Sequence, residues 1–250
     1  MRARLGSAQA EGEGEGGEVR GRHREGATRL SFKLVKSNVN NNPFVGLYAK
    51  ASDELVVVSP RVSKRFVSLC EEALGAKSLS VFVDQSPLIG IYVAMNSRGC
   101  VLPAFASERE VRALEREFSV CVLSSNHAPG NTILCNDRAA LVSRAVGAGD
   151  CDRIREALGV KVLHQSFAGM SAFASTTVVT NKGFYAYNDL NDTEFEHLKV
   201  LFGVNGLNGT TSFGTPFNSL SLIANSKGAV IGDLSSGVET QRVFEALSGD

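Results

Sequence analysis

The stretch MNSRGCVLP (95–103) has three counterparts further along the chain, and this repeat decides the fold. The counterparts are CNDRAALVS (135–143), TNKGFYAYN (180–188) and ANSKGAVIG (224–232). Each contains an apolar segment, an Asn-led turn and a second apolar segment, which is the pattern of a β-hairpin. KASDELVVVSP (50–60) fits the same frame, with an aspartate in place of the asparagine. The sequence therefore predicts five copies of one hairpin-containing unit.

One polar residue marks the turn of each hairpin. These residues are Asp53, Asn96, Asn136, Asn181 and Asn225, which stand 43, 40, 45 and 44 residues apart. Asn and Asp suit a tight turn because they tolerate positive φ and accept hydrogen bonds from their own backbone. Gly99, Gly183 and Gly228 are expected to give the turns the same backbone freedom.

A helical pattern of apolar residues follows each hairpin. Typical start signals are Ser107 with Glu110, Asn191 with Glu194, and Ser236 with Glu239, and glycines at 75, 159, 203 and 249 are expected to end helices. Third strands are predicted after the first four helices, at 79–83, 120–123, 161–164 and 204–207. The fifth helix has no such strand after it, and we expect residues 30–36 (LSFKLVK) to take its place.

The predicted fold class is α/β (α+β), a propeller of five βα units with pseudo-fivefold symmetry. Residues 29–250 form a single domain in this prediction, and the strand at 30–36 joins the first unit to the last and closes the ring, so that no sheet edge stays open. Repeats of this length also occur in WD40 propellers, but the blades of those proteins contain only strands. Residues 1–28, rich in alternating Glu and Gly, are expected to be a disordered extension.

Composition excludes several classes of protein. Of the 250 residues, 26 are Lys or Arg and 26 are Asp or Glu, so a protein that coats nucleic acid is not expected. No apolar run approaches the ~20 residues of a membrane span, and the chain does not begin like a secretory signal. The five cysteines form no CxxC and are expected to be reduced thiols. No His and Cys residues have the spacing of metal ligands, and neither a metal nor a cofactor is expected.

The repeat phrases, in this order, resemble the translation initiation factor 6 family, the ribosome anti-association factors of archaea and eukaryotes. The most specific pieces are LIGIYVAMNSRGCVLP (88–103), PGNTILCNDRAALVS (129–143), VVTNKG (178–183) and NSLSLIANSKGAVIGDLSSGVE (218–239). The resemblance extends from residue 30 to residue 250. It implies the pentein fold, a five-bladed βα propeller, which agrees with the five units indicated by the repeat.

The resemblance implies a binding role and not an enzymatic one. Family members dock on the large ribosomal subunit, on its intersubunit face, and thereby block joining with the small subunit. The implied contacts are a ribosomal protein near the sarcin–ricin loop and limited rRNA. In a eukaryote the resemblance also implies large-subunit biogenesis, release by a GTPase and its helper protein, and presence in the nucleus and nucleolus besides the cytoplasm. The factor is expected to act as a monomer without a membrane partner.

Two segments match family segments at the docking face. The first is 129–136, where Gly130 and Asn131 stand at the family's Gly-Asn. The second is GTTSFGTPFN (209–218), where Gly209, Thr210 and Gly214 match the family's Gly-Thr-x-Asn-x-Gly-Ser pattern, Ser212 replaces its Asn and Thr215 replaces its Ser. Phe213 and Phe217 look exposed in this Gly- and Ser-rich loop, where an aromatic residue could anchor an interface, and Phe217 is added as an aromatic interface residue. One of the two being buried and the other incidental also stays open. Ile91 stands where several eukaryotic members have Arg, and this leaves the polar contacts at the docking face open.

Two other functions remain as alternatives at this stage. The pentein class includes enzymes that modify guanidines with a Cys nucleophile, a His and acidic groups. A Cys among Cys100, Cys121 and Cys135 within hydrogen-bond reach of a His in the central channel would favour that function. The other alternative is a ring-shaped binding module with a partner other than the ribosome. For Asn131 itself, a role as a simple turn residue also stays open.

Overall fold

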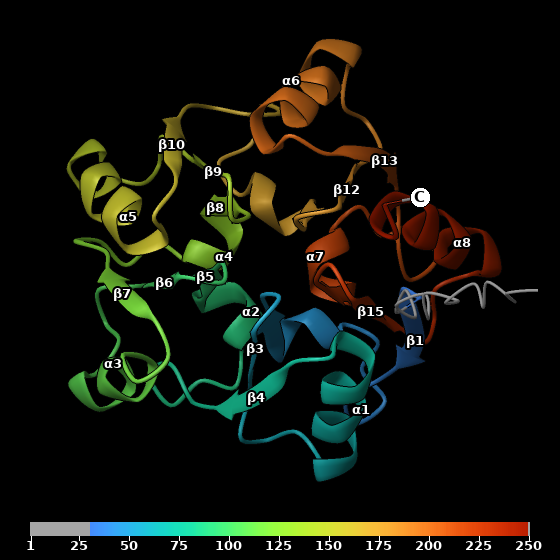
Figure 1. The fold of residues 1–250 in the computed structure, drawn as a ribbon, viewed down its shortest axis with the longest axis horizontal. Coiled ribbons are helices and arrows are strands. Elements are labelled where there is room, and N and C mark those ends of the chain that lie inside the picture. Colours follow the sequence, from blue (N-terminus) through green and yellow to red (C-terminus); the bar gives the residue numbers. More distant parts are fainter. Residues whose placement is uncertain (1–30, 250) are drawn as a thin grey trace, which may run out of the picture.

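Residues 31–249 are described by the computed structural model, and they form five three-stranded sheets arranged around a centre (Figure 1). This mixed α/β arrangement is consistent with the predicted five-fold architecture. The predicted disordered extension, residues 1–28, lies outside the described residues.

The five sheets share one topology, in which a central strand pairs with one antiparallel and one parallel neighbour. In this order within each sheet, the strands are β2 (Ala49–Ala51), β3 (Leu55–Val58) and β4 (Lys77–Ser80); β5 (Ala94–Met95), β6 (Gly99–Leu102) and β7 (Ser119–Val122); β8 (Ile133–Cys135), β9 (Ala139–Val142) and β10 (Lys161–His164); β11 (Val178–Val179), β12 (Gly183–Tyr187) and β13 (Asn205–Gly209); β14 (Leu222–Ala224), β15 (Gly228–Gly232) and β1 (Lys33–Ser37). The predicted strand–strand–helix–strand unit is therefore present, with boundaries shifted by up to three residues.

Five helices lie at the periphery, and five short helical turns lie near the centre (Figure 1). The outer helices are α1 (Lys64–Leu74), α3 (Glu108–Leu114), α5 (Cys151–Leu158), α6 (Asp192–Phe202) and α8 (Gly237–Leu247). The inner turns, each preceding the first strand of a sheet, are η1 (Val45–Leu47), α2 (Ile89–Tyr92), α4 (Pro129–Thr132), η3 (Phe173–Ser175) and α7 (Asn218–Ser221). One further turn, η2 (Ala148–Asp150), leads into α5. The capping boxes at Ser107, Asn191 and Ser236 are all present.

The first described strand completes the last sheet. β1 pairs in parallel with β15, with Lys33 opposite Gly228 and Ser37 opposite Gly232. β1 thus occupies the third-strand position that the other four sheets fill with the strand after their helix. The predicted segment 30–36 overlaps this strand, which spans 33–37. On the other side of the same sheet, β14 contacts β2 of the first unit.

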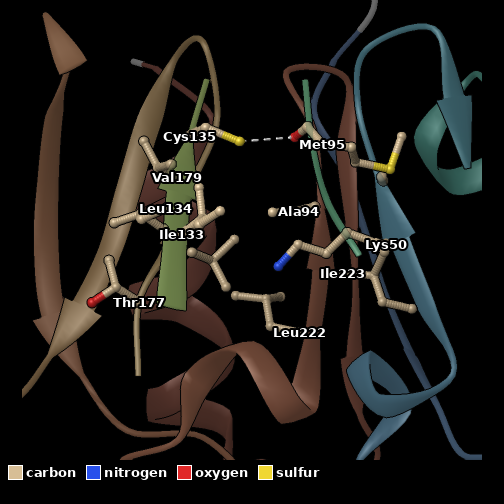
Figure 2. Close-up of a pocket in the computed structure, with 13 residues that line it drawn as sticks. Lys50, Ala94, Met95, Ile133, Leu134, Cys135, Thr177, Val179, Leu222 and Ile223 are labelled. Atoms are coloured by element: carbon tan, nitrogen blue, oxygen red, sulfur yellow. Dashed lines mark hydrogen bonds between the residues drawn. The ribbon is translucent and has the colours of Figure 1, made fainter. Parts of the chain in front are cut away.

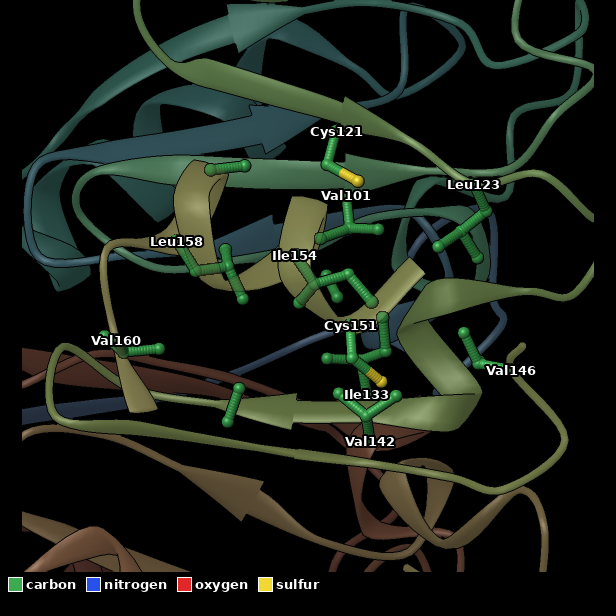
Figure 3. Packing of buried hydrophobic residues seen from close by; sticks show 13 residues of the cluster. Val101, Cys121, Leu123, Ile133, Val142, Val146, Cys151, Ile154, Leu158 and Val160 are labelled. Atoms are coloured by element: carbon green, nitrogen blue, oxygen red, sulfur yellow. The ribbon is translucent and has the colours of Figure 1, made fainter. Parts of the chain in front are cut away.

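The hydrophobic cores lie between units and not inside them. In the cluster of Figure 3, Ile154 and Leu158 of α5 pack between Val101 of β6 and Val142 of β9. The helix of one unit therefore also covers the sheet of the preceding unit, and α5 contacts β6 and β7 as well as β10. No unit buries its apolar surface alone, so the units depend on one another for stability.

Three glycines allow the units to approach closely. A Cβ on Gly99 would collide with the carbonyl oxygen of Ala157 in α5, and Gly183 and Gly228 meet the corresponding carbonyls of α8 and α1 in the same way. None of the three has a positive φ. The expected reason for these glycines was therefore wrong: they do not relax a turn but make room for the end of the neighbouring helix.

Buried asparagine amides link neighbouring units. The Nδ2 group of Asn136 donates to the carbonyl oxygens of Thr180 (3.1 Å) and Phe202 (3.2 Å), both in the next unit. Asn96 and Asn225 make the same pair of bonds to their own neighbours. Their Oδ1 atoms accept from the backbone of their own turn, as predicted for turn-forming asparagines.

Two of the five predicted turn residues are displaced by one position. Ser52 and Thr180, and not Asp53 and Asn181, accept the turn hydrogen bonds of their units. A hydroxyl oxygen reaches the same two backbone N–H groups as an asparagine oxygen, which explains why the alignment on Asp and Asn failed. Asn181 instead donates to the carboxylates of Asp53 (2.9 Å) and Asp137 (2.6 Å).

We expect Asn136→Ala to lower the free energy of unfolding by about 2–4 kcal/mol, because two buried carbonyls of the next unit lose their donor. Asn126→Ala, at an exposed loop position, is the matched control and is expected to change stability by less than about 0.5 kcal/mol. Urea unfolding followed by circular dichroism measures both. Equal stability of the two variants would show that the amide does not hold the units together.

Candidate functional site

Both predicted docking segments lie on or beside the ring of inner helical turns. Gly130 and Asn131 belong to α4, and residues 209–218 run from the end of β13 to the start of α7. α4 and α7 both contact η3, so one helical turn separates the two segments (Figure 1). The segments are 73 residues apart in sequence at their nearest (136 and 209), and the fold brings them to the same region.

Gly130 has a packing role in this ring. The residue is buried, and a Cβ on it would collide with the carbonyl oxygen of Gly90 in α2. A Cβ on Gly90 would likewise collide with the carbonyl oxygen of Gly46 in η1. A Cβ on Gly46 would collide with the carbonyl oxygen of Ser219 in α7. Consecutive inner turns therefore touch through their backbones, and any side chain at Gly130 would push α4 away from α2.

Asn131 is half-buried beside this contact. Its backbone N–H donates to the carbonyl oxygen of Ala128 (3.1 Å). Its side-chain Oδ1 is buried and has no hydrogen-bond partner within residues 31–249. A buried acceptor without a donor costs about 1–3 kcal/mol, so turn formation alone does not explain this side chain.

The second segment contains a tight turn with an unusual backbone. Thr211 and Thr215 bridge its base, and Ser212, Phe213 and Gly214 have φ values of 49°, 60° and 88°. Positive φ is unfavourable for a bulky residue such as phenylalanine. The equivalent turns of three other units place Asn41, Gln85 or Gly169 at the position of Phe213, so only this turn carries an aromatic ring there.

A carboxylate from the next helix holds this turn in place. Glu239 of α8 accepts hydrogen bonds from Thr210 Oγ1 (3.0 Å), from the backbone N–H of Gly214 (2.9 Å) and from that of Phe213 (3.3 Å). It also accepts from the N–H of Ser236, the capping-box contact that the sequence predicts. Burial of Glu239 opposes its ionisation, but the hydrogen bonds from Gly214, Ser236 and Thr210 outweigh this and lower the pKa of the carboxyl.

Several predicted site residues support the loop from inside. The Ser212 side chain is buried against Ser221 of α7, with Oγ atoms 3.0 Å apart. Thr215 Oγ1 donates to the carbonyl oxygen of Ser212. Gly209 leaves room for the ring of Tyr185, whose hydroxyl donates to the carbonyl oxygen of Thr210 (2.9 Å). These residues make the loop rigid and expose few of their own atoms.

Four large apolar side chains are exposed next to this rigid loop. Phe213 is 76% exposed and Phe217 45%, and Leu234 and Val238 at the start of α8 are 50% and 72% exposed. The two stretches are joined by the bond from the Ser212 N–H to Ser235 Oγ and by the contacts of Glu239. We call Phe213, Phe217, Leu234 and Val238 the apolar patch.

The sequence indicated half of this patch. The aromatic residues stood out in a Gly- and Ser-rich loop, but Leu234 and Val238 were missed. A signal for Val238 was available, since the buried Val243 and Leu247 define the inner face of α8 and Val238 lies off that face. The second role of Glu239 had no local signal, because its loop partners lie 25 to 29 residues away in the chain.

No group of three or more His, Cys, Asp or Glu side chains suited to a metal ion occurs within residues 31–249. Of the cysteines, Cys135 lines a small axial cavity between the first strands of the five sheets. Its thiol donates there to the carbonyl oxygen of Met95 (3.3 Å). No His lines that cavity or its mouth, and burial raises the pKa of the thiols of Cys100 and Cys135 to about 12. The geometry that would favour a guanidine-modifying enzyme is therefore not found there.

The model of the eIF-6 family matches residues 34–246. The chain belongs to the eIF-6 family. Similar curated proteins named translation initiation factor 6 come from Pyrococcus horikoshii (34% identity, covering 86% of this chain and 98% of that protein), Saccharolobus islandicus (32%; 86% and 99%) and Staphylothermus marinus (30%; 87% and 99%). The membership assigns the chain to protein biosynthesis, and the family name describes a translation factor and not an enzyme.

A solved crystal structure assigned to a peptidyl-arginine deiminase is also similar to 48% of this eIF-6 family chain. The TM-score is 0.34 and the identity 12%, too low to carry a conclusion about fold or activity. In the described part of the chain, no helix is both long and apolar enough to cross a membrane.

We expect Glu239→Gln to release the turn at Phe213 without unfolding the protein. The variant is expected to lose about 1–3 kcal/mol of stability, because a neutral amide replaces a charged acceptor of several hydrogen bonds. Amide hydrogen exchange at Phe213 and Gly214 is expected to accelerate. Glu245→Gln, on the exposed face of the same helix, is the control and should leave both measurements unchanged.

The same carboxylate makes the loop pH-dependent. Because the folded-state pKa of Glu239 lies below its ordinary value of 4.5, its stabilising contribution is complete above about pH 4.5 and is lost as the pH falls through the folded-state pKa. Glu239→Gln should remove this part of the pH dependence. Unchanged exchange rates and pH dependence in the variant would contradict the role given to Glu239.

Proposed function

We propose that this protein binds the large ribosomal subunit at its intersubunit face and sterically prevents joining with the small subunit. Family membership supports this proposal, since the relatives are translation initiation factors. The observation that carries it is the rigid turn at 209–218 with the apolar patch beside it. Within the proposal the protein acts by occupying space and catalyses no reaction.

The docking surface in this proposal consists of the predicted residues in α4 and the turn, with the apolar patch added. Of the predicted residues, Gly214 and Phe217 are exposed, Asn131, Gly209, Thr210 and Thr215 are half-buried, and Gly130 and Ser212 are buried. The buried ones shape the surface and the others contact the partner. A surface ordered before binding loses little conformational entropy on docking, which favours affinity.

The proposed partner is a ribosomal protein near the sarcin–ricin loop, with limited contact to rRNA. Aromatic and aliphatic groups such as those of the patch dominate protein–protein contacts. A formal net charge of zero suits this partner, because strong RNA binding would require an excess of Lys and Arg.

The cellular setting proposed for the protein follows from the same function. It acts in the cytoplasm as a monomer. In a eukaryotic cell it would also enter the nucleus and nucleolus, accompany large-subunit biogenesis, and be released by a GTPase with its helper protein.

The purified protein is expected to co-sediment with large ribosomal subunits of its own species and to reduce the yield of joined ribosomes at micromolar concentration. Phe213→Ala and Phe217→Ala are expected to weaken binding by tenfold or more, since exposed aromatic contacts are worth about 2 kcal/mol at interfaces. Asn131→Ala is expected to weaken binding while the melting temperature stays near that of the wild type.

Val200→Ala is the matched control for the aromatic variants. Val200 is 81% exposed on α6, outside the proposed surface, and its loss should leave binding unchanged. Sedimentation of the wild-type protein apart from the subunits would refute the proposed function. Binding that survives in the aromatic variants would refute the assignment of the surface.

We further propose that residues 29–250 fold as one domain whose ring is closed by β1. The pairing of β1 with β15 and the contact between β14 and β2 support this. Deletion of residues 30–36 is expected to abolish cooperative thermal unfolding, because the last sheet loses its third strand. Deletion of residues 1–27 serves as the control and should leave the melting temperature unchanged. A cooperative melt after the first deletion would show that β1 does not close the ring.

A further inference from the structure

A small cavity lies on the axis of the ring, between the first strands of all five sheets (Figure 2). Its volume is about 40 Å³, and its walls come from β2, β5, β8, β11 and β14. Such a volume holds about two or three water-sized occupants. The cavity is therefore large enough for a small ion and too small for an organic substrate.

Lys50 is the one charged residue among those that line this cavity. In Figure 2 its side chain extends from β2 into the space between the strands. The register of the hairpins places Ala94, Leu134, Val178 and Ile223 at the equivalent position of the other units. Each of these four packs in a hydrophobic cluster between two units. Packing thus explains an apolar residue at this position and does not explain a lysine.

The ammonium group of Lys50 has no counter-charge in the cavity. It makes no hydrogen bond or ion pair to any residue in the range 31–249. Cys135 lies near it, but burial raises the pKa of that thiol to about 12 and the thiol donates to Met95. Asp53 and Asp137 stand outside, at the mouth of the cavity, where they accept from Ser226, Ser97 and Asn181.

Thr177 is a second polar residue that lines the cavity, but its side chain does not face Lys50. Thr177 stands where the other units have Ala49, Val93, Ile133 and Leu222. It is 1% exposed, and its Oγ1 has no hydrogen-bond partner in the described structure. In Figure 2 this hydroxyl points away from Lys50. The ammonium of Lys50 is therefore the unpaired donor that reaches the space between the strands, and it calls for a partner that the described residues do not supply.

We propose that the axial cavity is a binding site for a small inorganic halide, chloride in the cell, held by the ammonium of Lys50. A halide fits the volume, balances the charge and accepts hydrogen bonds without donating any. A carboxylate or phosphate would leave most of its oxygen atoms without donors among the apolar residues of the wall. Burial lowers the pKa of Lys50, and a bound anion opposes this effect by favouring the charged form.

The bound halide completes the core at this place of the ring. The halide lies next to β2, where Lys50 replaces the apolar side chain that the first strand of every other sheet contributes at this position. Because it binds the folded protein and not the unfolded chain, it stabilises the fold by an amount that grows with the logarithm of its concentration above the dissociation constant. The site is independent of the docking surface, so its test does not depend on the proposed function.

The thermal stability of the full chain tests the proposal. In sodium chloride the melting temperature is expected to rise by about 3–5 °C for each tenfold increase in chloride above the dissociation constant, compared with sodium gluconate at equal ionic strength. Lys50→Met, which restores an apolar side chain at this position, is expected to fold and to lose the difference between the two salts. An equal response of both proteins to chloride would overturn the proposal.

Crystals of the wild-type protein soaked in bromide give a readout that requires no variant. An anomalous peak inside the cavity, within hydrogen-bond distance of Lys50 Nζ, is expected. A cavity that contains only water, or bromide confined to the protein surface, would overturn the proposal whatever the melting data show.

Discussion

The contact on which the arrangement of the units depends most is the close approach of one unit to the end of its neighbour's helix. Gly99, Gly183 and Gly228 make this approach possible, because any Cβ would strike a helix carbonyl. The amides of Asn96, Asn136 and Asn225 then donate to carbonyls that the approach buries. A unit that rotates away leaves those carbonyls without a donor, at about 1–3 kcal/mol each. One geometry is thereby favoured at the four contacts between units that contain one of these glycines, one of these asparagines, or both. The first unit has Leu55 and Ser52 at the corresponding positions.

The sequence predicts the units of this fold well and their contacts poorly. Helix starts such as Ser236 with Glu239 are local signals, since the residues that interact are three apart. The third strand at 161–164 was predicted to the residue. The reason for Gly99 was wrong, because its requirement comes from Ala157, which is remote in the chain. An alignment of the repeats does not show which residue of the neighbouring unit a given residue contacts.

For the candidate site, too, the sequence predicts local features and misses the contacts between units. Phe217 stands out from the composition of its loop, and it is exposed as expected of an interface residue. The network at Glu239 joins residues of two units, so its part in shaping the turn at Phe213 became visible only in three dimensions. Ser212, predicted to contact the partner, is buried against Ser221, and its contribution to docking is to hold the loop.

Departures from the repeat separate structural from functional residues. In a ring of like units, packing makes the same demand at five equivalent positions, so a residue found at only one of them needs another explanation. Lys50 replaces an apolar residue, and Phe213 replaces the Asn, Gln or Gly that suits a positive φ. Each substitution is unfavourable by itself, since an ammonium without a counter-charge inside the protein and a strained backbone both reduce stability. Their persistence in a stable ring is explained when each has a partner outside the chain: an anion for Lys50, and a docking surface for Phe213.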